Sequence, residues 1–248
     1  MKCLILAAGY ATRLYPLTES FPKPLLKVGE KSILDWLVDD LSLDQSITEY
    51  VVISNHKYLE NFQEWRKTKK LKITVIDDGT TSNETRLGAV RDIQLAIDVL
   101  SIKEDVLVIA GDNLLDFSLL SFLRYAKTKN SSCVMRYMET SKQRLQKSGV
   151  LEIGEEDRVL CLEEKPMHPK SEWACPPFYY YTQEDVPLVK QGIEAGCGVD
   201  APGSYIAWLC RQTKVYAMEM PGKRYDIGNM ESYENVQKTY QGILNSSK

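Results

Sequence analysis

The chain alternates between two hydrophobic periods. Short apolar runs bounded by polar residues predict buried strands, and apolar residues at helical spacing predict amphipathic helices. The predicted strands of the first half are 2–7, 50–54, 71–76 and 105–113. The predicted helices between them are 33–43, 59–65 and 87–100. This βαβα order implies a mostly parallel sheet that is covered by helices on both faces.

The second half of the chain is less regular. Its predicted strands are 132–138, 148–153, 158–163, 177–181 and 214–220. Its predicted helices are 184–195, 203–211 and 230–244. No linker, low-complexity tract or internal repeat interrupts the pattern. We therefore predict a single domain over 1–248 with a Rossmann-like α/β fold. It would have a mostly parallel mixed sheet flanked by helices, and a β-rich subregion in its second half.

Three loops are expected at one edge of this sheet. Ligands of such sheets bind outside the carboxyl ends of the parallel strands. The loops that follow the predicted strands at this edge are 8–27, 77–88 and 111–116. Candidate binding residues are therefore expected in these loops.

The composition is that of a soluble globular protein, with 44% hydrophobic and 26% charged residues. The net charge of −3 gives no overall attraction for nucleic acid, so an anion site has to be built from a few local cations. No apolar stretch approaches the ~20 residues that cross a bilayer, and we read the run at 2–7 as a strand and not as a signal peptide.

Cysteine and histidine usage indicates a reducing compartment and argues against zinc. The six cysteines lie far apart and form no C-x-x-C pair, which favours reduced thiols and a cytoplasmic location. Cysteine spacing alone does not exclude a zinc site, but the chain has only two histidines, His56 and His168, which argues against one.

The loop after the first strand combines small residues with cations. Ala8 and Gly9 let backbone amides approach a ligand closely. Arg13 carries a planar guanidinium suited to phosphate oxygens, and Lys23 lies between two prolines that stiffen its backbone. Taken alone, these two cations would be solvated residues of a surface loop. Asp112, at the end of a predicted buried strand, would alone be read as a cap or turn residue.

Five segments of the chain resemble a known family. The first two are A-A-G-Y-A-T-R-L-Y-P-L-T at 7–18 and P-K-P-L-L at 22–26. They resemble the signature of the sugar-1-phosphate nucleotidylyltransferases, which include glucose-1-phosphate thymidylyltransferases and uridylyltransferases. The other three are A-G-D-N at 110–113, E-E-K-P at 163–166 and Y-D-I-G at 225–228. They follow the order of the family, so the resemblance covers nearly the whole chain. A dinucleotide-binding dehydrogenase is excluded because the first turn lacks G-x-G-x-x-G.

The resemblance implies roles for named residues. The implied catalytic residues are Arg13, Lys23 and Asp112. The implied nucleotide-binding residues are Leu6, Ala8, Gly9, Arg13, Lys23, Asn83 (with Glu84 as its alternative) and Gly88. The implied acceptor-binding residues are Gly149, Glu164 (with Glu163 as its alternative) and Lys165. The implied ligands of the expected cofactor, Mg²⁺, are Asp112 and Asp226.

The resemblance also implies a reaction. A nucleotidyl group would pass from a nucleoside triphosphate to a sugar 1-phosphate, which releases pyrophosphate and forms a nucleotide sugar. The half 1–130 would bind the triphosphate, and the half 131–248 would bind the acceptor. The expected partners are these two substrates, with no nucleic acid and no membrane. The oligomeric state stays open, homo-oligomers included.

One segment departs from the family pattern. The stretch A-C-P-P-F-Y-Y-Y at 174–181 stands where the family commonly has a small Asn/Thr-x-Gly element. Two prolines and an aromatic run would narrow or reshape the acceptor pocket. Two alternatives therefore stay open: a cytidylyltransferase that acts on a small non-sugar phosphate, and a non-catalytic relative that binds nucleotide sugars. The sequence fixes neither the base nor the acceptor.

Overall fold

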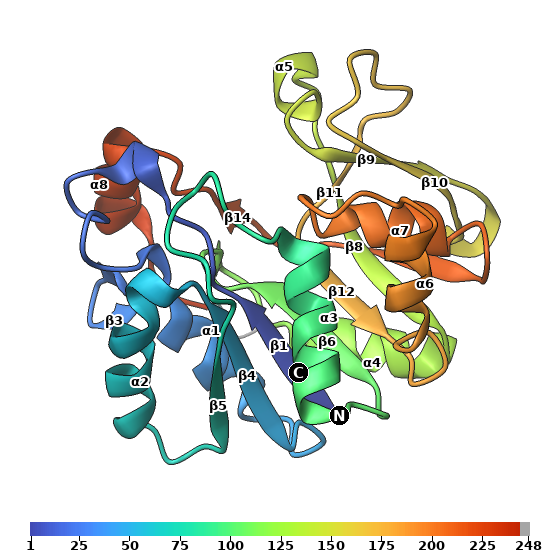
Figure 1. Cartoon of the computed structure of the whole chain (residues 1–248). Helices are drawn as coiled ribbons and strands as arrows, with labels where there is room; N and C mark the ends of the chain where they lie inside the picture. Colours follow the sequence, from blue (N-terminus) through green and yellow to red (C-terminus); the bar gives the residue numbers. More distant parts are fainter. Residues whose placement is uncertain (244–248) are drawn as a thin grey trace. The chain divides into compact units, whose positions relative to one another are not determined.

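The computed structural model describes residues 1–243, and the chain divides into two compact units (Figure 1). Unit 1 combines Met1–Arg86, Ala110–Ser121 and the described residues from Pro221 onward. Unit 2 combines Leu87–Ile109 and Phe122–Met220. The chain thus enters each unit more than once, so neither predicted half, 1–130 or 131–248, coincides with a unit. That the whole chain is a single domain stays a prediction.

Unit 1 is built on three parallel strands. The strands are β1 (Lys2–Leu6), β4 (Glu49–Ser54) and β5 (Ile73–Asp77). They pair in the order β1-β4-β5, with Leu4 opposite Val51 and Val52 opposite Val75. Every residue of β4 is buried, which explains why its sequence is an almost unbroken apolar run.

The remaining elements of unit 1 are three helices, two short ladders and three 3₁₀ turns. The helices are α1 (Ile33–Leu41), α2 (Leu59–Lys67) and α8 (Met230–Thr239). The ladders pair β2 (Lys27–Val28) with β3 (Lys31–Ser32) and β7 (Leu114–Leu115) with β14 (Arg224–Tyr225). The turns are η1 (Thr12–Leu14), η2 (Lys23–Leu25) and η3 (His56–Tyr58).

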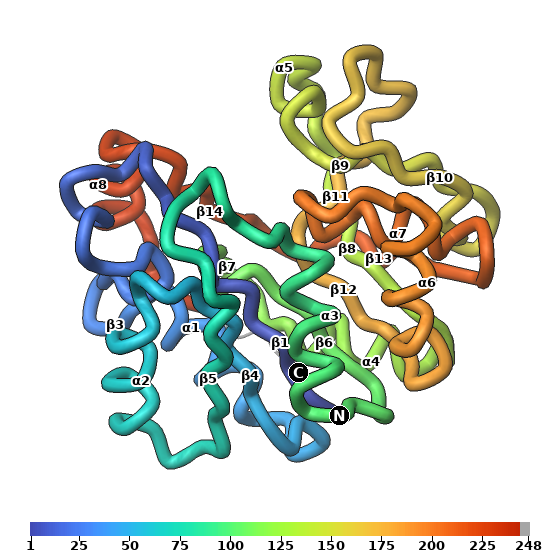
Figure 2. Tube along the Cα trace, in the orientation of Figure 1, coloured from blue at the N-terminus to red at the C-terminus, as the bar shows by residue number. Residues whose placement is uncertain are grey.

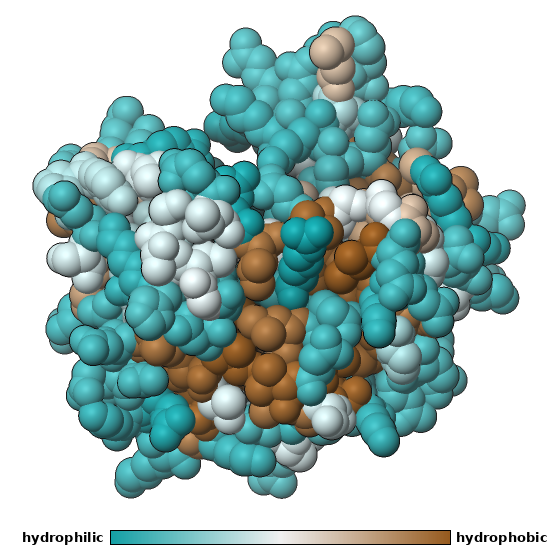
Figure 3. Space-filling model, viewed as in Figure 1, coloured by the Kyte–Doolittle hydropathy of each residue, from teal (hydrophilic) through white to brown (hydrophobic). Residues whose placement is uncertain are grey.

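Local sequence explains the helices of unit 1. Capping boxes start α1 at Ser32 and α8 at Asn229, where each side chain accepts a hydrogen bond from the backbone three residues on. The helix α2 buries Phe62 and Trp65 and leaves polar residues outside. Figure 3 shows this hydrophilic outer surface around α2, at the left of the view.

Unit 2 has a mostly antiparallel sheet. Its strands are β6 (Val106–Ala110), β8 (Ser132–Met138), β9 (Gly149–Ile153), β10 (Val159–Glu164), β11 (Trp173–Cys175), β12 (Phe178–Tyr181) and β13 (Val215–Glu219). They run in the order β10-β9-β11-β8-β12-β6, and β13 pairs with β8 in parallel. The chain trace in Figure 2 shows how β9, β10 and β11 lie together.

Five helices and one turn complete the described elements. They are α3 (Ala89–Leu100), α4 (Leu120–Lys129), α5 (Lys142–Leu145), α6 (Leu188–Glu194), α7 (Gly203–Leu209) and the 3₁₀ turn η4 (Glu155–Asp157). The predicted α/β fold, with a mixed, mostly parallel central sheet flanked by helices and a β-rich subregion, is confirmed. The parallel pairs of unit 1 and the antiparallel pairs of unit 2 make up that mixture.

Several element boundaries differ from the predicted ones. The helix predicted over 87–100 begins at Ala89, because Gly88 has a φ of 94°. The helix predicted over 184–195 begins only at Leu188, after Pro187 at its N-cap. The helix predicted over 230–244 ends at Thr239, and residue 244 lies outside the described residues. The helix α4 was not predicted from the hydrophobic pattern.

Two expectations about the class of protein can be compared with the structure. No helix among residues 1–243 has the length and apolar character that a membrane span requires. All six cysteines lie within the described part of the chain, and none of them forms a disulfide.

A buried carboxylate in β4 joins this strand to both of its neighbours, β1 and β5. Glu49 in β4 is 4% exposed and contacts Lys2 Nζ at 2.6 Å, Thr74 Oγ1 at 2.7 Å and Lys72 Nζ at 3.2 Å. Burial raises the pKa of Glu49, but these hydrogen bonds and the charge of Lys2 outweigh burial and lower the pKa to about 2. The ionised form therefore stabilises the folded protein.

We predict that Glu49→Gln changes how stability depends on pH. The folded-state pKa is lowered from the ordinary value of 4.5, so the contribution of Glu49 is fully present above that value and is lost as the pH falls towards about 2. The free energy of unfolding, measured by urea at several pH values, should differ most from the wild type near neutral pH. The exposed Glu64→Gln serves as the control. A difference for Glu49→Gln that is constant from pH 7 to pH 2 would contradict this account.

Candidate active site

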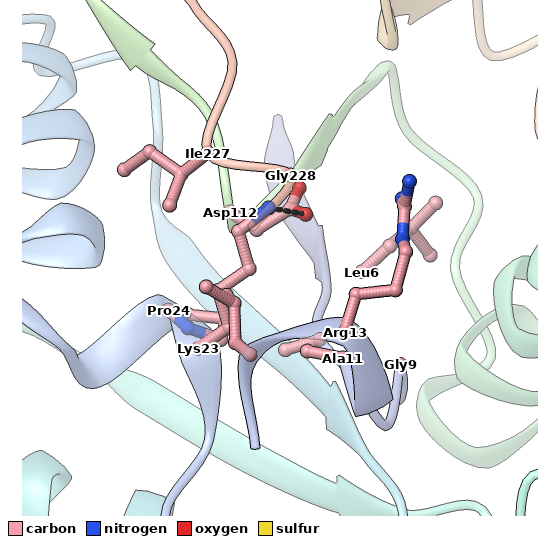
Figure 4. Close-up of a pocket in the computed structure, with 11 residues that line it drawn as sticks. Leu6, Gly9, Ala11, Arg13, Lys23, Pro24, Asp112, Ile227 and Gly228 are labelled. Atoms are coloured by element: carbon pink, nitrogen blue, oxygen red, sulfur yellow. Dashed lines mark hydrogen bonds and ion pairs between the residues drawn. The ribbon is translucent and has the colours of Figure 1, made fainter. Parts of the chain in front are cut away.

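A cavity of about 220 Å³ opens at the carboxyl end of β1 in unit 1 (Figure 4). It is lined by residues of the loop after β1, of the turn η2, of the segment after β6 and of the segment after β14. These residues are Leu6, Ala7, Gly9, Ala11, Arg13, Leu14, Lys23, Pro24, Asp112, Ile227 and Gly228. The structure therefore gathers the three predicted catalytic residues, Arg13, Lys23 and Asp112, around one cavity.

An ion pair between Lys23 and Asp112 forms one wall of this cavity. Lys23 Nζ donates to Asp112 Oδ2 at 2.7 Å, and the two side chains are 10% and 44% exposed. The turn η2 fixes the lysine backbone between Pro22, its N-cap, and Pro24. Burial raises the pKa of Asp112, but the charge of Lys23, its hydrogen bond and the charge of Arg224 outweigh burial and lower that pKa. The carboxylate is therefore ionised at neutral pH.

The second oxygen of Asp112 is held by a neighbour that the sequence analysis did not assign. Asn113 Nδ2 donates to Asp112 Oδ1 at 3.2 Å and to Ala110 O at 3.1 Å. Arg224 Nη1 in turn donates to Asn113 Oδ1 at 3.0 Å. These bonds fix the amide of Asn113 and, through it, the orientation of the carboxylate. Asn113 lies beside Asp112, and Arg224 directly precedes the Y-D-I-G segment at 225–228, so both positions were signals for this role.

Arg13 extends separately from the Lys23–Asp112 pair (Figure 4). Its side chain is exposed and makes no hydrogen bond or ion pair with any residue of 1–243. Gly228 lies beside it, since a Cβ at Gly228 would be 4.0 Å from Arg13 Nη1 and 3.7 Å from Asp226 Oδ2. The guanidinium is thus available to an anion that enters the cavity.

The predicted nucleotide-binding residues are distributed over both units. Leu6 and Gly9 line the cavity, and Ala8 lies between them in sequence. Asn83 belongs to unit 1 but does not line the cavity, and its carbonyl oxygen accepts a hydrogen bond from Arg86 Nη1 at 3.1 Å. The binding roles of these residues stay predictions.

Gly88 belongs to unit 2 and has a packing role there. A Cβ at this position would lie 2.5 Å from the carbonyl oxygen of Val199, and the backbone has a φ of 94°. The next two amides, of Ala89 and Val90, donate to Asp200 O at 3.2 Å and Val199 O at 3.0 Å. Only glycine lets the start of α3 lie this close to the segment 199–200.

The three predicted acceptor-binding residues lie together in unit 2. A Cβ at Gly149 would be 3.3 Å from Glu164 Oε1 and 3.4 Å from the Cβ of Cys175. Lys165 follows Glu164 with a φ of 50°, and its amide donates to Ser148 O at 2.9 Å. Its exposed ammonium is 3.8 Å from a carboxylate oxygen of Asp200. These positions present a carboxylate and an ammonium side by side.

The carboxylate of Glu164 is held in a partly buried position. Burial raises its pKa, and the charge of Lys165 and a hydrogen bond from the Gly203 amide oppose that rise without cancelling it. A Cβ at Gly203 would meet Glu164 Oε1 directly and would be 3.4 Å from the hydroxyl of Tyr179. The glycine therefore makes room for the carboxylate, which has one backbone donor and free capacity for further donors.

The segment 174–181 lies beside predicted acceptor-binding residues and also packs into the core. Cys175 ends β11 beside Gly149, and Tyr179 in β12 brings its hydroxyl near Glu164, while the reshaping of the acceptor pocket stays a prediction. All four aromatic residues of the run, Tyr179 included, are buried core residues. Tyr180 is 4% exposed and donates to Asp105 Oδ2 at 2.6 Å, and Phe178 is fully buried.

The two predicted Mg²⁺ ligands, Asp112 and Asp226, both belong to unit 1. No group of three or more His, Cys, Asp or Glu side chains in the described part of the chain could hold a metal ion. Asp112 lines the cavity, and Asp226 precedes the cavity residues Ile227 and Gly228. Two carboxylates match Mg²⁺, which keeps waters and substrate phosphate oxygens as its other ligands.

The comparison with known families identifies the class of protein that this fold and cavity define. Residues 2–242 match the sequence model of the family described as Nucleotidyl transferase. The chain therefore belongs to this family, and the resemblance drawn from its sequence segments is confirmed.

Two individual relatives and one solved structure show how similar this chain is to known proteins. The bifunctional protein GlmU of Methanocaldococcus jannaschii is 26% identical over 231 residues, which are 92% of this chain and 51% of the relative. Glucose-1-phosphate thymidylyltransferase of Neisseria meningitidis is 28% identical over 200 residues, which are 77% of this chain and 65% of the relative. The chain thus spans about half to two thirds of these relatives. The fold is similar to that of a UDP-glucose pyrophosphorylase solved with UDP-glucose, with a TM-score of 0.81, 21% identity and coverage of 96% of this chain and 97% of that one.

We predict that Gly88→Ala acts on stability, in contrast to Gly79→Ala. Both glycines have a positive φ, but a Cβ at Gly79 would meet nothing within 4 Å. Gly79→Ala should therefore cost only the backbone strain, about 1–2 kcal/mol, while Gly88→Ala should cost clearly more because it also displaces the segment at Val199. Urea unfolding of both variants measures the difference. Equal losses would show that the close approach at Gly88 has no energetic weight.

Proposed function

We propose that this protein transfers a nucleotidyl group from a nucleoside triphosphate to a sugar 1-phosphate, which forms a nucleotide sugar and releases pyrophosphate. The observation that carries the proposal is the cavity of unit 1, which gathers Arg13, Lys23 and Asp112 beside the small residues of the loop after β1. Membership of the nucleotidyl transferase family supports it, as do relatives named as glucose-1-phosphate nucleotidylyltransferases.

The reaction requires positioning and charge neutralisation, without a covalent intermediate. An oxygen of the acceptor phosphate attacks the α-phosphorus and forms a new P–O bond. The bond from the α-phosphorus to the oxygen that bridges to the β-phosphate breaks, and pyrophosphate leaves with that electron pair. Arg13 would bind the triphosphate and Lys23 would neutralise charge at the α-phosphate.

The acceptor would be bound by residues of unit 2. Lys165 would contact its phosphate, and Glu164 would accept hydrogen bonds from its hydroxyl groups, since the carboxylate already has only one backbone donor, the Gly203 amide. The prolines at 176 and 177 offer no N–H to an acceptor. The second candidate for the acceptor is therefore a small non-sugar phosphate. The nucleotide donor would then be a cytidine nucleotide.

Asp112 and Asp226 would hold Mg²⁺, which when bound neutralises phosphate charge. The chain's own contribution is an ionised, oriented carboxylate at Asp112, held by Lys23 on one oxygen and by Asn113 on the other.

We further propose a cytoplasmic location, which fits six unpaired cysteines.

The substrate proposal is tested by a matrix of nucleoside triphosphates against sugar 1-phosphates and small non-sugar phosphates, with pyrophosphate release as the readout. We expect turnover with at least one sugar 1-phosphate when Mg²⁺ is present and none after its removal by a chelator. Turnover confined to CTP with a non-sugar phosphate would favour the second candidate. Tight binding of nucleotide sugars with no turnover of any pair would indicate a non-catalytic relative.

We predict that Lys23→Ala lowers kcat by about a hundredfold or more, because the charge at the α-phosphate then has no fixed partner. Lys27→Ala is the matched control, since Lys27 is exposed and lies four residues on, outside the cavity. Initial rates with both substrates saturating measure the effect, and circular dichroism checks that the variant folds. A folded Lys23→Ala variant with a kcat near that of the wild type would show that Lys23 does not neutralise charge at the α-phosphate.

We predict that Asp226→Asn raises the Mg²⁺ concentration needed for half-maximal rate at least tenfold, as about 1.4 kcal/mol of lost affinity implies. A carboxamide oxygen is neutral and binds the ion less strongly than a carboxylate. Asp39→Asn, which changes a surface ion pair with Lys31, should leave this concentration unchanged. An Asp226→Asn variant with the wild-type Mg²⁺ dependence would show that Asp226 is not a ligand.

A further inference from the structure

Carbonyl groups of the loop after β1 are tied to the turn that follows β4. Asn55 Nδ2 donates to Ala8 O at 2.9 Å. The hydroxyl of Tyr58 donates to Thr18 O at 2.6 Å and lies 3.3 Å from Tyr10 O. Asn55 and Tyr58 are both fully buried, so these polar contacts are shielded from water.

Thr18 fixes another carbonyl group of the same loop. Its Oγ1 donates to Ala11 O at 2.8 Å, and the threonine is fully buried. Ala11 has a φ of 46° and a ψ of 40°, a left-handed backbone that a non-glycine residue adopts at some cost. The loop from Ala8 to Thr18 is therefore fixed through its carbonyl groups, by contacts from outside it and within it.

The direction of these carbonyl groups decides where the amides point. In a trans peptide the C=O of one residue and the N–H of the next point in opposite directions. Since the carbonyls of Ala8 and Ala11 point to their buried donors, the N–H groups of Gly9 and Thr12 are directed away from them. Within residues 1–243 neither of these two N–H groups donates a hydrogen bond to the protein. Gly9 lines the cavity beside Arg13.

We propose that Asn55, Tyr58 and Thr18 are positioning residues for the triphosphate. They hold the loop carbonyls inward, so that the free N–H of Gly9 and the side chain of Arg13, two residues that line the cavity, face the ligand together. Backbone N–H groups presented in this way form an anion-binding concavity. The inference rests on the proposed function, because it assumes that the anion in the cavity is a triphosphate.

The test uses the full chain and inorganic tripolyphosphate as the probe. Isothermal titration calorimetry with Tyr58→Phe, which removes only the hydroxyl, should give binding about tenfold weaker than the wild type, the cost of a misdirected loop. The KM for the triphosphate should rise, while the KM for the acceptor should stay unchanged. Thr18→Val, which loses the bond to Ala11 O, should act in the same direction and carries the test if Tyr58→Phe does not fold.

Tyr50→Phe is the matched control. Tyr50 is 2% exposed on the same strand that leads to the turn, and its hydroxyl has no hydrogen-bond partner in the described structure. Losing this hydroxyl removes a buried phenol oxygen without touching the loop. Tyr50→Phe should therefore bind tripolyphosphate as the wild type does, and an equal loss in both variants would overturn the positioning role.

The two levels of the proposal fail in different experiments. Equal binding of tripolyphosphate by the wild type and by Arg13→Ala would remove the triphosphate site, and with it the proposed function and this inference. Wild-type binding that needs Arg13 but is unchanged in both folded variants, Tyr58→Phe and Thr18→Val, would overturn the positioning role alone. Weakened binding in these two variants, with Tyr50→Phe unaffected, is the result we expect.

Discussion

The ion pair between Lys23 and Asp112 is the interaction on which the cavity of unit 1 depends. A lysine whose side chain is 10% exposed needs a partner, because an unpaired buried charge destabilises a protein by several kcal/mol. Asp112 lies 89 residues away along the chain, so the pair joins the loop after β1 to the segment after β6. The same contact holds the two charged groups that the proposed chemistry uses, so stability and function depend on one geometry.

Much of this arrangement could be predicted because short segments of the sequence determine it. The strands β1, β4 and β5 are short apolar runs, and parallel strands place the loops at their carboxyl ends on one edge. Arg13 and Lys23 lie in the loop after β1, and Asp112 follows β6. The loops 8–27 and 111–116 were expected at one edge, and their residues Arg13, Lys23 and Asp112 line one cavity, whereas no residue of the third expected loop, 77–88, lines it.

The parts that could not be predicted are contacts between side chains and partners that lie far apart in the sequence. Arg224 reaches Asn113 across 111 residues, and Tyr58 reaches the carbonyls of a loop 40 or more residues away. In sequence, Tyr58 reads only as an apolar residue near the start of a helix. For Gly88 the motif suggested ligand contact, which stays a prediction, and it did not indicate the close backbone approach at Val199 that the structure shows.

The two cations of the cavity, Lys23 and Arg13, differ in whether they already have an ion-pair partner. This difference would give them different roles in the reaction. Lys23 already has Asp112 as its partner, so an incoming phosphate would exchange one anion for another and gain little net energy there. Arg13 is exposed and has no partner among residues 1–243, so its attraction for phosphate is not offset by a lost contact. Ground-state affinity for the triphosphate should therefore depend mainly on Arg13. Lys23, rigid between Pro22 and Pro24, is better suited to charge that grows during the reaction, because a fixed charge needs no reorganisation when that charge develops.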